Sequence, residues 1–134
     1  TSISTNLLPT PTAAGRAVFV REVATGHTWR VAPGGNFLSL SSDGHMLAFE
    51  SGEDFLPADT NEQYDAFVWD RATLDVTRVN VTPAGGQSTA PGDGLATPTI
   101  DPTGVAIVFA SDASDLVVGD TNGFIDVFLA TDFR

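Results

Sequence analysis

The chain has 134 residues, the size of one domain, and 42% of them are hydrophobic, which is enough for a core. It holds 17 acidic residues, six arginines and no lysine, and the formal net charge of −11 argues against binding to nucleic acid or to an anionic membrane surface. The absence of cysteine excludes disulfide bonds, and no stretch is long and apolar enough to cross a bilayer.

Residues 1–15 hold two prolines and several Thr and Ser, a composition typical of an extended arm or linker. Beyond them, short apolar runs between Gly, Pro, Asn and Asp clusters predict strands. The stretch 82–95 is rich in Gly, Pro and Ser and is long for a compact domain, so we expect it to be functional or mobile. No helix is expected, because no apolar positions recur at helical spacing over ten residues. The predicted strands lie near residues 16–22, 27–32, 36–41, 45–51, 64–70, 75–81, 96–101, 105–111 and 125–131.

A repeat organises these strands. Residues 111–128, SDASDLVVGDTNGFIDVF, match residues 51–67, SGEDFLPADTNEQYDAF, and the match extends upstream, where 40–51 align with 100–111. A fainter copy of the second half of the unit aligns residues 19–31 with 67–79. The repeated unit therefore has four strands, connected by a turn, a polar loop and a hairpin.

Glycine stands at the same place in the first turn of both full copies. Gly44 and Gly104 each end a polar cluster and precede an apolar run. Asp and Ser in such clusters bond to nearby backbone, and glycine supplies a positive φ. Thr25-Gly26 and Leu74-Asp75 fall where the hairpin turns belong.

The repeated motifs resemble those of a known family. SSDGHMLAF at 41–49 resembles the S-P-D-G-x-x-[IVL]-A-[FY] turn and strand of TolB-like, WD-like β-propeller repeats, and the strands that begin at Asp65 and Asp126 are similar to that family's D-[IV]-[FY]-[VL] strand. The Asp-Thr-Asn-Gly loop resembles a subgroup of secreted and cell-surface bacterial propellers. The sequence departs from the pattern at three places. Ser42 replaces the usual Pro, Pro102-Thr103 replaces the usual Pro-Asp, and Glu62 stands where Gly is expected.

The resemblance implies an all-β fold of four-stranded antiparallel propeller blades. Residues 16–35 would form half a blade, 36–95 a full blade, and 96–134 three strands of the next. A closed propeller has about four to eight blades, so this number cannot close a ring. We therefore expect either a segment of a longer chain or several copies that complete the propeller together.

The Asp-Thr-Asn loops are candidate calcium sites. Ca²⁺ is bound by six to eight oxygen ligands, and a glycine allows the sharp turn that such loops need. The alternative is that Asp and Asn bond their own backbone as Asx turns. The second copy is the stronger candidate, because Gly123 directly follows its Asp-Thr-Asn sequence. The candidate ligands are Asp120, Asn122 and Asp126 in the second copy and, more weakly, Asp59, Asn61 and Asp65 in the first.

Other chemistry finds little support. His27 and His45, the two histidines, lie in or beside turns and in no catalytic spacing, so no catalytic residue and no cofactor other than Ca²⁺ is predicted. Trp29 and Trp69 fit packing between strands better than carbohydrate stacking. Many acids, Glu50 among them, are expected in the loops after the second strand of each unit, where they would create a negative face.

The resemblance implies a non-catalytic structural or protein-binding module of a secreted, periplasmic or cell-surface bacterial protein. Its partner would be another protein, or further copies that complete the propeller. Two alternatives remain open at this stage. One is an accessory or catalytic propeller of a hydrolase acting on peptides or glycosides, and the other is a calcium-stabilised adhesion module.

Overall fold

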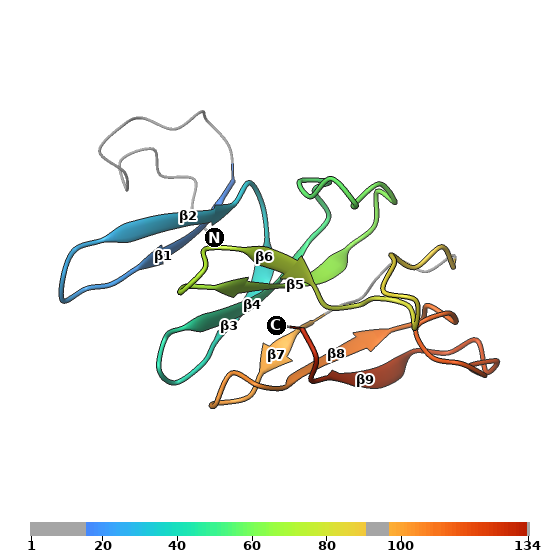
Figure 1. The fold of residues 1–134 in the computed structure, drawn as a ribbon. Helices are drawn as coiled ribbons and strands as arrows, with labels where there is room; N and C mark the ends of the chain where they lie inside the picture. Colours follow the sequence, from blue (N-terminus) through green and yellow to red (C-terminus); the bar gives the residue numbers. More distant parts are fainter. Residues whose placement is uncertain (1–15, 91–96, 134) are drawn as a thin grey trace.

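The chain folds into three antiparallel β-sheets that lie side by side (Figure 1). The computed structural model describes residues 16–90 and 97–133, and all regular structure in these ranges is strand. The described residues contain no helix, and hence no apolar helix that could span a membrane. The predicted arm at 1–15 lies outside the described residues, as do positions 91–96 of the predicted loop.

Each described strand lies within a range predicted from the sequence, so the all-β fold is confirmed. The three sheets have the strand orders β1-β2, β3-β4-β5-β6 and β7-β8-β9, and every neighbouring pair is antiparallel. We call them the first, central and third sheets. The strands are β1 (Val18–Arg21), β2 (Thr28–Ala32), β3 (Asn36–Leu40), β4 (Met46–Ser51), β5 (Asp65–Asp70), β6 (Val76–Arg78), β7 (Thr99–Ile100), β8 (Ile107–Ser111) and β9 (Asp126–Ala130).

The sequence repeat has the same pairing register in two sheets. Phe49 pairs with Phe67 between β4 and β5, and Phe109 pairs with Phe128 between β8 and β9. The ring centroids are 5.6 Å apart in the first pair and 5.5 Å apart in the second. The central and third sheets are therefore structural copies of each other, as far as the third sheet extends.

The predicted turn glycines have the backbone that the motif requires. Gly44 and Gly104 have φ of 70° and 73°, in the left-handed region that glycine adopts without steric cost. In the hairpins, Gly26 has φ of 73° and Leu74 has φ of 67°, so the two hairpin turns match in conformation although only one contains glycine.

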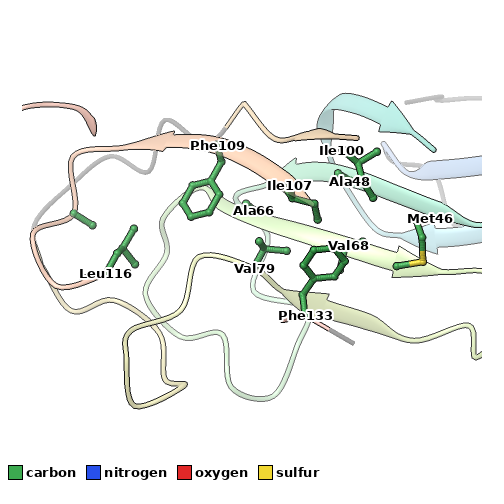
Figure 2. Close-up of a cluster of buried hydrophobic side chains, with 11 residues drawn as sticks. Met46, Ala48, Ala66, Val68, Val79, Ile100, Ile107, Phe109, Leu116 and Phe133 are labelled. Atoms are coloured by element: carbon green, nitrogen blue, oxygen red, sulfur yellow. The ribbon is translucent and has the colours of Figure 1, made fainter. Parts of the chain in front are cut away.

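Two apolar clusters lie between neighbouring sheets. One joins the first sheet to the central sheet and includes Val18, Ala32, Leu47, Phe49, Phe67 and Trp69. The other joins the central sheet to the third sheet, and Figure 2 shows Ile107 and Phe109 of β8 on the side that faces Ala66 and Val68 of β5. Because side chains alternate along a strand, β5 contributes to both clusters and the central sheet is covered on both faces.

Polar contacts fasten the central and third sheets where β3 and β7 meet. The Ser39 Oγ accepts a hydrogen bond of 3.1 Å from the Ile100 backbone N–H. The Ser42 backbone N–H and its hydroxyl both donate to the Pro102 carbonyl oxygen, at 3.0 and 2.6 Å. Ser42, which departs from the family pattern, thus has a specific role between the sheets.

Glu50 lies in β4 and is only 5% exposed, so its assignment to an exposed acidic loop was wrong. Its side chain and the ring of Phe49 point to opposite faces of the sheet, because successive side chains alternate along a strand. The carboxylate makes no hydrogen bond or ion pair with another described residue, and burial raises the pKa of Glu50 to about 7.

Candidate functional site

Two of the predicted metal ligands of the first copy, Asp59 in the first loop (residues 52–64) and Asp65 at the start of β5, lie together around an arginine. Arg78 of β6 has its Nη2 2.6 Å from the Asp59 Oδ1 and its Nε 3.6 Å from the Asp65 Oδ2. All three side chains are buried. The Asp59 Oδ1, the Asp65 Oδ2 and the Arg78 Nε make no well-aligned hydrogen bond, so these contacts are mainly electrostatic.

Asn80 extends this cluster to the main chain of β5. Its Nδ2 donates a 2.6 Å hydrogen bond to the Asp65 Oδ1, and its Oδ1 accepts a 3.0 Å hydrogen bond from the Ala66 N–H. Asn80 is itself buried. We call Asp59, Asp65, Arg78 and Asn80 the arginine cluster, and it holds the last strand of the central sheet against the first loop.

Burial raises the pKa of Asp59, and the positive charge of Arg78 opposes that shift. The third predicted ligand of this loop, Asn61, forms an Asx turn instead, because its Oδ1 accepts a 3.2 Å hydrogen bond from the Gln63 N–H. A buried guanidinium thus already supplies positive charge to the two carboxylates of the first set.

The segment 82–90, the described part of the predicted Gly/Pro/Ser loop, is anchored on both long loops. The Gln87 Oε1 accepts hydrogen bonds of 3.1 Å from the Thr60 N–H and from the Arg78 Nη1. At its other end, the Ser88 hydroxyl and the Thr89 N–H donate to the carboxylate of Asp115. This part of the loop therefore has a structural role.

The second loop, residues 112–125, places the same residue types in an open arrangement. The Asn122 Nδ2 donates a 2.8 Å hydrogen bond to the Asp126 Oδ2, and the Asn122 Oδ1 accepts a 2.8 Å bond from the Phe124 N–H. A longer contact of 3.4 Å joins the Asn122 N–H to the Asp120 Oδ1. In the described chain no arginine forms an ion pair with Asp120 or Asp126.

Asp120 of the second loop and Asp126 of β9 line one shallow depression beside β9, with a volume of about 550 Å³. Asp120 and Asp126 are half-buried, whereas their counterparts Asp59 and Asp65 are buried. In residues 16–90 and 97–133, no group of three or more His, Cys, Asp or Glu side chains is arranged to hold a metal ion. Calcium binding by the two Asp and one Asn of each loop stays a prediction.

An apolar surface covers the outer side of the third sheet. Val108, Val127 and Leu129 are 43%, 75% and 67% exposed. In the repeat they correspond to Ala48, Ala66 and Val68 of the central sheet, which are 0%, 0% and 3% exposed because the third sheet covers them. We call Val108, Val127 and Leu129 the open face.

The aromatic and histidine candidates lie where packing explains them. Trp69 is buried, and its ring lies 5.9 Å from that of Trp29, which also has the Arg71 guanidinium 5.1 Å above it. His27 packs edge-on against Trp29 at 4.3 Å. The two tryptophans therefore take part in the contact between the first and central sheets.

Sequence reasoning did not identify Arg78, Asn80 or Gln87. A signal for the first was present, because the alignment of 19–31 with 67–79 places Arg30 opposite Arg78. Nothing in the sequence distinguishes a buried arginine at that position from an exposed one, and Arg30 is exposed. The observed contacts are needed to see that the Asp-Thr-Asn loop and the fourth strand act together.

Neither a protein-family model nor a curated protein matches the chain. Among solved structures it is similar to the crystal structure of TolB from Acinetobacter baumannii, with 15% sequence identity and a TM-score of 0.36. The alignment covers 85% of this chain and 38% of that one, so the chain spans well under half the length of that protein.

Proposed function

We propose that the chain is a non-catalytic structural and protein-binding module whose sheets are consecutive blades of a β-propeller. The observation that carries this proposal is the open face. Its valine and leucine side chains occupy positions that are fully covered in the preceding copy of the same unit. Exposing such residues in water is unfavourable by roughly 25 cal/mol per Å² of apolar surface, so a covering partner is favoured.

The occupant that we propose for the open face is another sheet of the same type. The third sheet covers the central sheet with Ile107 and Phe109, which belong to the alternate side of its strands. A further sheet with the same repeat would present the same side to Val127 and Leu129. The module would then work by adding blades, supplied by more of the same chain or by other copies, in a secreted, periplasmic or cell-surface protein.

Cysteine accessibility tests this proposal, because the chain has no cysteine of its own. Single variants Val127→Cys, Ala66→Cys and Val23→Cys are labelled with a maleimide in the intact assembly from the native source. Val23 is 90% exposed on the β1–β2 hairpin and Ala66 is fully buried, so they serve as the open and covered controls. We expect Val127→Cys to label as slowly as Ala66→Cys, and equal labelling of all three after denaturation.

Rapid labelling of Val127→Cys in the intact assembly, at the rate of Val23→Cys, would contradict a stacked sheet. The hydrolase alternative requires a separate measurement, namely turnover of peptide or glycoside substrates by the purified protein. Turnover together with a freely labelled open face would favour an enzyme over a binding module.

A further inference from the structure

Among the described residues, no strand pairs with the outer edge of β9 in the third sheet, and this edge is separate from the open face. Its strand order is β7-β8-β9, so β9 pairs with β8 on one side, and Figure 1 shows β9 as the outermost strand. In the central sheet the matching strand β5 has a neighbour on both sides, because β6 pairs with its outer edge. An unpaired edge exposes backbone N–H and C=O groups that can accept another strand.

The copy in the central sheet shows what such a strand needs. Arg78 of β6 lies opposite Phe67 of β5, and the Val79 N–H donates a 2.8 Å hydrogen bond to the Ala66 carbonyl. Two residues after the arginine, Asn80 bonds to both Asp65 and the Ala66 N–H. The sequence Arg-x-Asn of β6 and the residues after it thus contacts two carboxylates, Asp59 and Asp65, and also the backbone of β5.

The edge of β9 has the acidic half of this arrangement. Asp126 and Val127 correspond to Asp65 and Ala66, and Asp120 corresponds to Asp59. Asp120 and Asp126 line the depression beside β9 together with Val127, Phe128 and Leu129. The observed polar contacts of these carboxylates come from Asn122, which is exposed and can be displaced.

We propose that the edge of β9 binds an antiparallel strand with the pattern Arg-x-Asn, the arginine lying opposite Phe128. The guanidinium would lie between Asp120 and Asp126, and the asparagine would bond Asp126 and the Val127 N–H. Charge complementarity supports this occupant. The half-buried carboxylates of Asp120 and Asp126 lie beside the edge of β9, and their buried counterparts beside β5 hold an arginine. The inference rests on the proposed binding function but uses the strand edge, whereas the stacked sheet uses the open face.

The chain itself contains the probe for this test. A labelled, capped peptide with the sequence of residues 74–82, LDVTRVNVT, is titrated with the 134-residue chain, and binding is measured by fluorescence anisotropy. We expect saturable binding that falls about tenfold or more when the peptide's arginine is replaced by glutamine, because a hydrogen bond to a charged group is lost. A scrambled peptide of the same composition controls for net charge.

Protein variants locate the site. Asp126→Asn and Asp120→Asn should each weaken binding several-fold, whereas Asp54→Asn, which removes the same charge from an exposed position of the first loop, should not. Hydrogen exchange should show new protection at residues 126–130 and none at 65–70, where β6 already pairs. Circular dichroism verifies that each variant is folded.

Three outcomes would overturn the proposal. The first is no binding at millimolar peptide, the second is equal binding of the arginine and glutamine peptides, and the third is protection at 65–70 in place of 126–130. These results are independent of the cysteine labelling. A covered Val127→Cys with no peptide binding would leave the stacked sheet intact and remove only the strand addition.

Discussion

Glu62 and Gly123 hold the same place in the two long loops and share a left-handed backbone, with φ of 55° and 68°. Only glycine adopts this region without a steric penalty, which for other residues is roughly 1–2 kcal/mol. The conformation is therefore a property of the repeat, and in the first loop it is maintained with an unfavourable residue.

Glu62→Gly should raise the free energy of unfolding by about 1 kcal/mol, since it removes the strain and glycine's larger unfolded entropy offsets only part of the gain. Urea denaturation measures the change. Gln63→Gly is the matched control, because Gln63 is exposed, adjacent and free of positive φ, and it should lower stability. Equal effects of the two substitutions would contradict the argument from backbone strain.

Arg78→Met should lower the free energy of unfolding by about 3–5 kcal/mol, because it leaves Asp59 and Asp65 buried without their cation. Arg71→Met is the control. Arg71 pairs with Glu22 at 3.1 Å in a half-exposed position, and its loss should cost about 1 kcal/mol. A similar loss of unfolding free energy in both variants would contradict the argument that burial makes the ion pairs of Arg78 more important for stability.

Glu50 should make stability fall as the pH rises from about 4.5 to about 7. Burial raises its folded pKa to about 7 from 4.5, so the folded state binds the proton more tightly, and ionisation above that range destabilises it by about 3 kcal/mol. Glu50→Gln should remove this loss and be the more stable protein at pH 8. Glu53→Gln, which removes a carboxylate from an exposed neighbouring position, is the matched control.

Urea unfolding at pH 5 and pH 8 compares the three proteins. If Glu50→Gln has the same pH dependence as the unsubstituted chain, then the carboxylate is solvated in solution and the burial argument fails.

Gly35→Ala should lower stability by about 1–3 kcal/mol through overpacking. A Cβ at this position would lie 2.7 Å from the Val18 Cγ2, 3.0 Å from the Glu50 carbonyl oxygen and 3.0 Å from the Phe49 Cδ2. At Gly86 the nearest atom to an added Cβ is the Thr82 Oγ1 at 3.7 Å, so Gly86→Ala is a tolerated control. Thermal unfolding of both variants checks the difference, and equal melting temperatures would contradict close packing at Gly35.

Millimolar Ca²⁺ should raise the melting temperature relative to chelator if the second loop binds the ion, and Asp120→Asn should abolish the increase. Asp59→Asn should not be used for this comparison, because Asp59 pairs with Arg78. Mg²⁺ at the same concentration controls for ionic strength. An unchanged melting temperature would remove calcium as a ligand and, with it, the adhesion-module alternative.

The strands and turns could be predicted because they depend on local chemistry. Gly44 and Gly104 mark turns by their own backbone preference, and the short apolar runs that follow them match the pleat of a strand. The repeat strengthened these predictions, because Phe49 and Phe109 occupy the same position in two copies and indicate the same strand register.

The arginine cluster could not be predicted, because it joins residues from the first loop and β6 that meet only after the sheet forms. A list of acidic positions treats Asp59 and Asp120 as equivalent, yet one is buried against Arg78 and the other is half-exposed. Glu50 was misplaced for a related reason. It lies on the same side of β4 as Ala48, which packs in the cluster shared with the third sheet, and a pattern read along one strand does not include that packing.

Because β6 is short, the arginine cluster helps to keep the edge of β5 paired. A strand of three residues, Val76–Arg78, forms few ladder hydrogen bonds, so Arg78 and Asn80 supply much of what keeps it on β5. If the cluster were lost, the apolar strand β5 would present a bare edge to other chains. An unpaired edge can pair with strands of other chains and so start aggregation. By keeping β6 on β5, these buried charges also oppose aggregation.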